Sequence, residues 1–437
     1  MCVLEFGDNI MEIIVYLNFI ISLIFTLCYF YQFVYVFIGL FKKPKEFEAR
    51  EKHRYGVLIS ARNEAVVIKN LIESLNNQTY PAELVDIFVV ADNCDDDTAG
   101  AARELGAVVY ERFNKDLVGK GYALNWLLCN INKEYSVDNY DAFIIFDADN
   151  IVDTHFIEEM NKVYDSGYKI ITSYRNSKNY GENWISAGYS LWFLREAKLL
   201  NNARMIANTS CAVSGTGFLV STEILKKNNG WKHHLLTEDI EFTTDSIISG
   251  EKIGYSGKSV LYDEQPNTFY QSYIQRLRWS KGFYQVFRHY GARLIKGMFK
   301  GNFSCYDMFM TLTPAMLLTL ASTVINIAAI PYGILSKSDQ LPMLLKTLAE
   351  TFLGFYLIFF VLGFITTVTE WKNIYCSKVK KVLYTFTFPI FMLTYVPISV
   401  IALFKKVRWE PIKHTVSKTL TDICVETEET EKKETVQ

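Results

Sequence analysis

Two aspartates, Asp147 and Asp149, directly follow the apolar run 143–146. A short apolar run of this kind is typical of a buried strand, so both carboxylates are expected at the mouth of that strand. Buried charges without partners are costly, and a divalent cation completed by diphosphate oxygens is the natural partner of such a pair. The pattern therefore indicates a nucleotide site in which Asp147 and Asp149 hold Mg²⁺ or Mn²⁺. A D-x-D motif alone is common in loops, and its position at a strand end is what gives it weight.

Acidic residues also follow two earlier strand-like runs. Glu64 comes shortly after the run 56–59, and Asp92 directly follows the run 85–91. Helix capping explains polar residues at such places about equally well, so these two positions do not decide the chemistry alone.

Lys120 lies between Gly119 and Gly121. Glycines on both sides predict a close backbone approach, with the ammonium group available to an anion. The segment is not a phosphate-binding P-loop, because the G-x-x-x-x-G-K-[ST] spacing is missing.

A further acidic pair, Glu238 and Asp239, follows Thr237 and precedes the helical pattern 240–248. Capping of that helix by Thr237 or Asp239 is one explanation. The favoured explanation is a carboxylate held in a site, which is a candidate general base.

The segment 271–300 combines basic and aromatic residues at helical spacing. An amphipathic helix of this kind can lie on an anionic membrane leaflet without any catalytic role. Within it, Gln275, Arg278 and Trp279 have the spacing Q-x-x-R-W.

Short β-type runs alternate with helical patterns through the segment that contains these residues. The runs are 56–59, 85–91, 107–110, 143–146 and 170–173, and helical patterns start at Glu64, Thr98, Gly121 and Thr154. This alternation predicts an α/β domain with a mostly parallel sheet, whose ligands bind beyond the carboxyl ends of the strands. The acidic residues that end the runs are therefore expected at one edge of the sheet.

The composition excludes several classes of protein. The chain has 437 residues, of which 50% are hydrophobic and 15% aromatic, so it is neither disordered nor collagen-like. The formal net charge of -2, from 45 basic against 47 acidic residues, gives no reason to expect nucleic acid as a partner. The cysteines, 8 in number, include no C-x-x-C pair, which argues against a zinc ribbon or a disulfide framework.

Four stretches contain no Asp, Glu, Lys or Arg: 13–41, 308–336, 351–369 and 382–404. Each is near or above the roughly 20 residues that cross a bilayer, which predicts an integral membrane protein. The first lacks a signal-peptide cleavage pattern and is predicted to be a retained anchor. Basic residues at 42–54 and 372–381 predict that the middle of the chain lies in the cytoplasm. Because 382–404 contains Pro389 and Pro397, spanning, re-entrant and interfacial arrangements stay open, with a cytoplasmic tail favoured.

Taken in order, these motifs resemble those of the membrane-embedded processive β-glycosyltransferases of glycosyltransferase family 2: the cellulose, chitin, hyaluronan and poly-N-acetylglucosamine synthases. The signature of those enzymes is a strand-end Asp, a D-x-D, a T/E-E-D and a Q-x-x-R-W. It is matched by Asp92 and by the segments 147–149, 237–239 and 275–279. One departure is that the usual D-D-G after the second strand is Ala91, Asp92 and Asn93 here.

The resemblance covers about residues 55–300 and implies a domain organisation. A Rossmann-like GT-A glycosyltransferase domain is expected at 42–270, after an N-terminal membrane anchor at 1–41. Amphipathic interface helices at 271–307 and a membrane region at 308–404 are expected to follow. The tail 405–437 is expected to begin with a gating segment around 409–414 and to end in a polar, disordered stretch.

The resemblance also implies a role for each candidate residue. Asp239 matches the general base. The positions that match donor binding are Glu64, Asp92, Lys120, Asp147, Asp149, Gln275 and Arg278, with Asp149 and then Asp147 as the metal ligands. The positions that match the acceptor side are Trp279, Gly215, Thr216 and Glu238.

The implied function is an inverting β-glycosyltransferase that elongates and exports a cellulose-like β-linked polysaccharide at the plasma membrane. Its donor is a UDP-hexose, with UDP-glucose favoured over UDP-N-acetylglucosamine. Expected partners are this donor, a growing glycan or lipid acceptor, the bilayer and an accessory export or membrane subunit. Since only three or four apolar segments are available for a channel, a non-processive enzyme that makes a glycolipid such as glucosyl-diacylglycerol is the alternative. A receptor or scaffold with a degenerate transferase domain is a third hypothesis, which the intact acidic positions disfavour.

Overall fold

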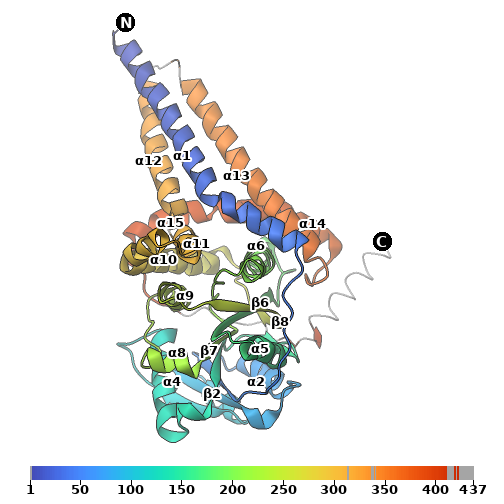
Figure 1. Ribbon diagram of the computed structural model, residues 1–437. Coiled ribbons are helices and arrows are strands. Elements are labelled where there is room, and N and C mark those ends of the chain that lie inside the picture. Colours follow the sequence, from blue (N-terminus) through green and yellow to red (C-terminus); the bar gives the residue numbers. More distant parts are fainter. Residues whose placement is uncertain are drawn as a thin grey trace.

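The structure, a computed structural model, describes residues 2–312, 314–335, 339, 341–410, 418–419 and 421–422. One end of the molecule is an α/β part built on a single 8-stranded sheet, and long apolar helices extend from the other end (Figure 1). The first helix of the chain lies beside helices from its last third.

The sheet has the strand order β3-β2-β1-β4-β7-β6-β8-β5. The strands are β1 Tyr55–Ala61, β2 Val85–Asp92, β3 Val108–Arg112, β4 Ala142–Asp147, β5 Ile151–Val152, β6 Ile170–Ser177, β7 Phe218–Ser221 and β8 Ile253–Asp263. The first four are parallel to one another, whereas β7 is antiparallel to β4 and β6. Each of the five runs expected as strands is a strand, and the predicted α/β class is confirmed.

The register brings the carboxyl ends of the parallel strands to one edge of the sheet. Ser60 of β1 pairs with Val90 of β2 and with Asp147 of β4. The residues that follow these strands, Glu64 and Asp92 among them, therefore lie beyond the same edge, where α/β sheets bind ligands.

Helices connect the strands. They are α2 Ile68–Asn76, α3 Thr98–Arg103, α4 Lys120–Glu134, α5 Phe156–Asp165, α6 Trp184–Arg195, α7 Asn202–Ile206, α8 Thr222–Lys227 and α9 Glu238–Ile248, with short turns η1 Ala82–Leu84 and η2 Val137–Asn139 and the π-helical η3 Glu196–Asn201. In α2 the apolar residues recur at helical spacing and are buried against the sheet.

The helix expected from Glu64 begins later, at Ile68. The carbonyl oxygen of Glu64 accepts hydrogen bonds from the backbone N–H groups of Val67 and Ile68, and its own N–H donates to Thr98 Oγ1 at 2.9 Å. Glu64 therefore belongs to a turn tied to the neighbouring loop, which is why α2 starts beyond it.

Four helices lie across the boundary between the sheet and the long helices (Figure 1). They are α10 Phe269–Phe299, α11 Phe303–Leu312, α14 Lys378–Leu393 and α15 Tyr395–Phe404. Arg276 of α10 is fully buried, and its Nη1 donates to Thr394 Oγ1 at 2.6 Å and to the carbonyl oxygen of Phe391 at 3.2 Å. A buried guanidinium thus binds the break between α14 and α15.

The long helices are α1 Cys2–Phe41, α12 Pro314–Leu335 and α13 Leu341–Thr369. By length and composition, 3 helices of the described chain can cross a membrane: Ile10–Phe41, Leu341–Thr369 and Lys378–Phe404. The stretch expected at 308–336 is divided between α11 and α12, and it contributes only a shorter apolar helix, Leu320–Leu335. The stretch at 382–404 is apolar enough to span, yet α14 and α15 lie against α6 and α10 at the base of the long helices.

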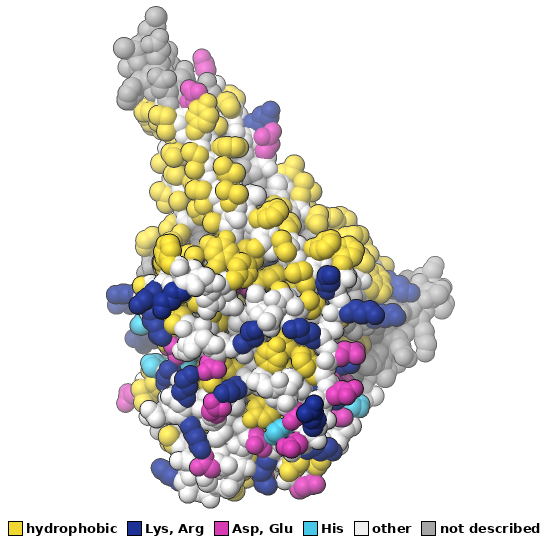
Figure 2. Space-filling model, in the orientation of Figure 1, with side chains coloured by type: hydrophobic (Ala, Val, Ile, Leu, Met, Phe, Trp, Pro, Cys, Tyr) yellow, Lys and Arg dark blue, Asp and Glu magenta, His cyan; other side chains and the backbone are white. Residues whose placement is uncertain are grey.

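Apolar and charged side chains separate along the molecule. Figure 2 shows apolar side chains covering the long helices, charged side chains over the α/β part, and groups of Lys and Arg where the two regions meet. This distribution is that of a membrane-associated protein whose α/β part lies in water.

Candidate active site

Lys120 is the first residue of α4, where a close approach of two segments determines its position. A Cβ atom on Gly121 would lie 2.0 Å from the carbonyl oxygen of His233, so only glycine lets α4 pack against that segment. The Nζ of Lys120 donates to Asp147 Oδ1 at 2.5 Å and to the carbonyl oxygen of Gly215 at 2.7 Å. The glycine-flanked lysine and the first aspartate of the D-x-D motif therefore meet.

Lys120 is cationic at this place. Burial lowers the pKa of its ammonium group, but the charges of Asp147 and Glu238 raise that pKa by more. The site thus holds the positive charge of Lys120 among carboxylates. An incoming anion could take the place of one of these carboxylates beside the ammonium group.

The carboxylates of Glu238 and Asp239 lie in the first turn of α9. Burial raises the pKa of Glu238 to about 7, and the charge of Asp239 adds to this rise. Burial also raises the pKa of Asp239, while the backbone N–H of Ile240 and the charge of Lys120 oppose the rise. The pair therefore titrates as a unit, and one of its carboxylates can accept a proton near neutral pH.

The segment 214–217 passes between these groups. Gly215 has a φ of 81°, and a Cβ atom on it would lie 3.6 Å from Asp239 Oδ2. The hydroxyl of Thr216 accepts a hydrogen bond from the backbone N–H of Asp147 at 2.8 Å and donates to Asn150. Gly215 and Thr216 thus hold the D-x-D turn and bring it next to the carboxylate of Asp239.

The second aspartate of the D-x-D motif, Asp149, is buried with 3% of its surface exposed. Its Oδ2 accepts a hydrogen bond from the backbone N–H of Glu264 at 3.2 Å. Asp147 is partly exposed. The described residues contain no group of three or more His, Cys, Asp or Glu side chains that could hold a metal ion by themselves. One or two carboxylates with room for other oxygen ligands fit a divalent ion that a diphosphate helps to hold.

The Q-x-x-R-W residues reach the site from α10, which packs closely on the start of α9. A Cβ atom on Gly282 would lie 2.5 Å from the side chain of Thr237, so glycine permits this contact. Burial lowers the pKa of Arg278, and the charges of Glu238 and Asp147 oppose this effect. Arg278 therefore faces the acidic group across the site.

Four buried polar atoms on this helix have no hydrogen-bond partner among the residues that the structure describes, and two of them belong to the Q-x-x-R-W residues assigned to the site. They are Nε of Arg278 and Oε1 of Gln275, and both are buried. Buried polar groups in native proteins are nearly always satisfied, so such atoms at the wall of a site are typical of groups that bind a ligand.

Trp279 packs edge-on against two aromatic residues of α6. Its ring lies 5.6 Å from that of Tyr189 and 6.2 Å from that of Phe193, centroid to centroid. The indole is only partly buried, so it keeps an accessible surface beside the helices at the membrane boundary.

Asp92 and Glu64 form a second group along the same edge of the sheet. Nη1 of Arg112 donates to Asp92 Oδ1 at 2.5 Å, and the amide of Asn93 donates to the same oxygen at 3.1 Å. Burial raises the pKa of Asp92, and Arg112 opposes that rise. No hydrogen bond or ion pair between described residues joins Asp92 directly to Lys120, so the candidate site has two parts along the strand ends.

Arg175 and Asp263 also lie at the candidate site, although no sequence motif identified them. Nε of Arg175 donates to Asp263 Oδ2 at 3.1 Å, and its Nη1 donates to the carbonyl oxygen of Ser214 at 2.8 Å. Asp263 Oδ1 accepts from the amide of Asn150 at 2.8 Å. The one available signal was that Asp263 ends its strand and Arg175 lies two residues before the end of its own.

The model of a protein family described as glycosyltransferase like family 2 matches residues 53–282. The probable glycosyltransferase YdaM of Bacillus subtilis is 24% identical over 276 residues, covering 60% of this chain and 62% of that protein. A β-monoglucosyldiacylglycerol synthase of Nostoc sp. is 23% identical over 304 residues, covering 66% of this chain and 60% of that protein. A poly-β-1,6-N-acetyl-D-glucosamine synthase of Staphylococcus epidermidis is 21% identical over 235 residues, covering 52% of this chain and 54% of that protein. The chain thus spans less than two thirds of the length of these curated relatives.

Among solved structures, the chain resembles the mannosyltransferase PcManGT from Pyrobaculum calidifontis, which was solved in complex with GDP-Man and Mn²⁺. The TM-score is 0.57 at 16% sequence identity, covering 89% of this chain and 99% of that chain. A likeness at this identity concerns the fold.

Proposed function

The chain belongs to glycosyltransferase family 2 and has the GT-A fold, and from this premise we propose that it transfers a hexose from a UDP-hexose to an acceptor hydroxyl at the membrane boundary. UDP-glucose is the favoured donor over UDP-N-acetylglucosamine. The observation that carries the proposal is the meeting of Lys120, Asp147 and the coupled Glu238–Asp239 pair beside the Q-x-x-R-W helix.

The donor side is assigned to Glu64, Asp92, Lys120, Asp147, Asp149, Gln275 and Arg278. The uracil and ribose lie against Glu64 and Asp92, and the diphosphate lies between Lys120 and Arg278. Arg278 supports this assignment because its buried Nε lacks a partner among described residues, which a phosphate oxygen would supply. A hydroxyl of the donor would likewise satisfy the buried oxygen of Gln275.

Asp149 and Asp147 are the residues that would hold the metal, Mg²⁺ or Mn²⁺. A divalent ion bound there offsets the negative charge that gathers on the leaving diphosphate. Lys120 and Arg278 act on the same charge, because both are cations at the wall of the site.

Asp239 is the general base of the proposed reaction. Its carboxylate takes the proton of the acceptor hydroxyl, whose oxygen bonds to the anomeric carbon on the face opposite the UDP. The bond to the UDP oxygen breaks, UDP leaves with the bonding electrons, and an α-linked donor gives a β-linked product. Glu238, Gly215, Thr216 and Trp279 are assigned to the acceptor side, with the indole offering a flat apolar face to a sugar ring.

The first product that we propose is a cellulose-like β-linked polysaccharide, elongated at a cytoplasmic active site and exported across the plasma membrane. One similar protein is named as a synthase of a β-linked polysaccharide, which supports this choice. The described long helices leave most of their surfaces exposed, since 6% of the apolar window of α1 and 17% of that of α13 are buried. An export channel would therefore need an accessory subunit or a further copy of the chain to complete it.

A glycolipid is the second candidate product, and the same exposure of the helices favours it. A lipid acceptor reaches the boundary helices from the bilayer and needs no channel. Another similar protein is named as a β-monoglucosyldiacylglycerol synthase, which fits this alternative.

One experiment separates the candidates. Purified protein is incubated with Mg²⁺ or Mn²⁺ and, separately, with radiolabelled UDP-glucose and UDP-N-acetylglucosamine, with and without diacylglycerol, and Asp239→Asn serves as the control. Aqueous high-mass product cut by β-glucanase or chitinase identifies a polysaccharide synthase and its donor. A small species in the organic phase identifies a glycolipid synthase. Release of no UDP with any donor contradicts the proposed function and revives a degenerate scaffold.

A further inference from the structure

A π-helical turn interrupts the helix that leads from α6 to α7. It covers Glu196–Asn201, between Trp184–Arg195 and Asn202–Ile206. The π-helix is rare because its wider turn is less favourable than the α-helix, and where it persists it is frequently part of a functional site. Its contacts show what holds it and which residue it presents.

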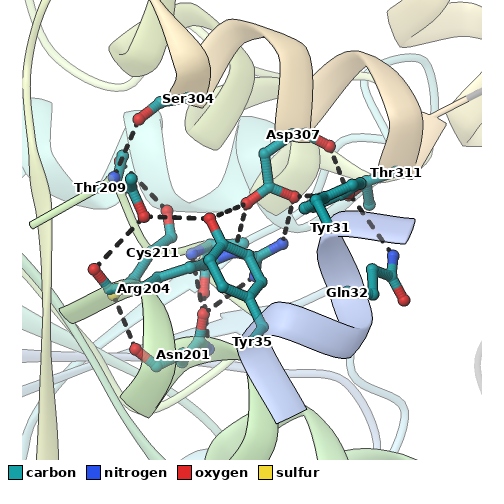
Figure 3. A network of polar contacts seen from close by, with 12 residues as sticks. Tyr31, Gln32, Tyr35, Asn201, Arg204, Thr209, Cys211, Ser304, Asp307 and Thr311 are labelled. Carbon is teal, nitrogen blue, oxygen red and sulfur yellow. Dashed lines mark hydrogen bonds and ion pairs between the residues drawn. The ribbon is translucent and has the colours of Figure 1, made fainter. Parts of the chain in front are cut away.

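The end of the turn is fixed by a buried polar network (Figure 3). Asn201 Oδ1 accepts hydrogen bonds from Arg204 Nη1 at 3.2 Å and from the backbone N–H of Ala212 at 3.1 Å. Arg204 forms two 2.8 Å hydrogen bonds to Asp307, and the hydroxyl of Tyr35 donates to the same carboxylate at 3.1 Å. Figure 3 shows these side chains converging from α1, α7 and α11. The turn is therefore tied to α1 and α11 and to the segment around Ala212, which leads into 214–217.

The start of the turn is held from two sides. The guanidinium of Arg175 lies 3.7 Å from the centre of the Phe193 ring, and Nη2 of Arg195 donates to Gln32 Oε1 at 2.8 Å. Glu196 is the next residue after Arg195 and lies one helical turn after Phe193, so both belong to the same face. That face is the one that contacts Arg175 and Trp279.

Glu196 is the carboxylate that this turn presents. No hydrogen bond or ion pair to a described residue involves its side chain, although protein surrounds it and part of it stays exposed. Burial raises the pKa of its carboxyl group, the charges of Arg204, Arg175 and Arg195 oppose that rise, and the charge of Asp239 adds a smaller contribution to it. A partly exposed carboxylate on the face that contacts Arg175 and Trp279, with no hydrogen bond or ion pair to a described residue, is available to a ligand.

We propose that Glu196 is an acceptor-binding residue, which accepts a hydrogen bond from an acceptor hydroxyl other than the one that Asp239 deprotonates. This inference rests on the proposed function, since it assigns an acceptor residue to the same site. The acceptor must therefore carry a second free hydroxyl near the reacting oxygen, as the sugar at the end of a glycan does. Diacylglycerol does not, because its only free hydroxyl is the one that reacts. The rigid network behind the turn holds the carboxylate in place and lowers the entropy cost of binding.

The test compares Glu196→Gln and Glu196→Ala with the wild type, with Glu104→Gln as the matched control. Glu104 is an exposed carboxylate paired with Lys69, outside the site. For each protein, the acceptor KM is measured with a β-linked oligosaccharide in one arm and with diacylglycerol vesicles in the other. Donor KM, UDP affinity and thermal midpoint are measured in parallel.

The expected result is a rise of the oligosaccharide KM by about 10- to 100-fold for Glu196→Ala, whereas the diacylglycerol arm shows no rise. Glu196→Gln, which keeps an accepting oxygen, shows a smaller rise, and UDP affinity stays unchanged in both. An unchanged oligosaccharide KM overturns the inference, as does a wild type that is active only with diacylglycerol. So does a joint loss of UDP affinity and thermal stability, which would make Glu196 a counter-ion of Arg204 and Arg195. A wild type inactive in both arms instead refutes the proposed function itself.

Discussion

The substitution Gly121→Ala tests whether the close packing of α4 positions Lys120, which we assign to the donor side of the proposed site. A new Cβ would lie 2.0 Å from the carbonyl oxygen of His233 and 3.0 Å from two further backbone atoms. These neighbours are backbone, so no side-chain rotation relieves the contact. The start of α4, with Lys120, must move away from the segment at 233–234.

The size of the movement follows from the contact. Reaching ordinary van der Waals contact, which begins at 3.4 Å, requires a shift of roughly 1.4 Å. The Nζ of Lys120 lies 2.5 Å from Asp147 Oδ1, so a shift of this size away from Asp147 breaks the bond. A misplacement of about 1 Å costs on the order of 100-fold in rate, whereas overpacking costs about 1–3 kcal/mol of stability. Activity should therefore be lost from a protein that still folds.

The assay measures UDP release from the donor that the wild type uses, together with the midpoint of thermal unfolding. The matched control is Gly354→Ala in α13, where an added Cβ would meet nothing within 4 Å. The control should keep its activity and be at least as stable as the wild type. The Gly121→Ala protein should lose about 100-fold in kcat and keep a cooperative unfolding transition.

One result would refute this reasoning. Alanine is a better helix former than glycine by about 1 kcal/mol, so without the contact at His233 the Gly121→Ala variant would be more stable. A variant that is both more stable and fully active would show that α4 does not depend on glycine. It would also remove the argument that the glycines around Lys120 position its ammonium group.

Four further predictions concern other parts of the molecule. Asp239→Asn should abolish transfer while UDP binding survives, and calorimetric titration with UDP checks this; lost UDP binding would contradict its role as base. The pKa of Glu238 is about 7 and that of Asp239 is raised, so this pair of carboxylates takes up a proton as the pH falls, and kcat/KM should fall below about pH 7. In Glu238→Gln the fall of kcat/KM on the acid side should move to lower pH. An unmoved pH profile would exclude the coupling between Glu238 and Asp239. Asp307→Asn should lower the free energy of unfolding by about 3–5 kcal/mol, because it leaves a buried guanidinium without its charged partner; an unchanged thermal midpoint would contradict this. Trp409 lies 5.3 Å from the guanidinium of Arg62 beside the donor side, so Trp409→Ala should change turnover if the segment after α15 gates the site; unchanged kcat and donor KM would remove that proposal.

The sequence predicted the acidic residues at the strand ends because their signal is local. An apolar run that changes abruptly to Asp at 147 or 92 shows both the strand and the edge at which it ends. The alternation of runs and helical patterns then predicted the parallel part of the sheet. These inferences need only neighbouring residues, which is why they agree with the structure.

The partners of those residues could not be predicted in the same way. Arg112 binds Asp92 from the end of the neighbouring strand, and Arg175 binds Asp263 across 88 positions of the chain. A single sequence gives the types of such residues without their pairing, which only the folded register supplies. Glu196 gives no sequence signal at all, because its availability depends on what surrounds it.

The apolar stretch at 382–404 shows a different limit. Composition alone makes it long and apolar enough to cross a membrane. In the structure it lies along the base of the long helices, where the buried guanidinium of Arg276 binds the break at Thr394. That contact joins two segments more than a hundred residues apart, so no count of hydrophobic residues could reveal it. The candidate segment for the gate, 409–414, is described only at residues 409 and 410, and 411–414 lie outside the described residues, as does the tail from 423 onward.

Under the proposed function, the Q-x-x-R-W helix links the chemistry at the sheet to the boundary helices. Residues two apart on a helix point in different directions, so Arg276 and Arg278 serve different neighbours. Arg276 binds the break between α14 and α15, while Arg278 faces the carboxylates at the start of α9. Gly282, on the same helix, contacts Thr237 without a side chain between them. One rigid helix is therefore fixed at both the boundary helices and the proposed base. Under the proposed function, an acceptor that arrives along the boundary meets Trp279 at a set distance from Asp239, and the helix itself provides that distance.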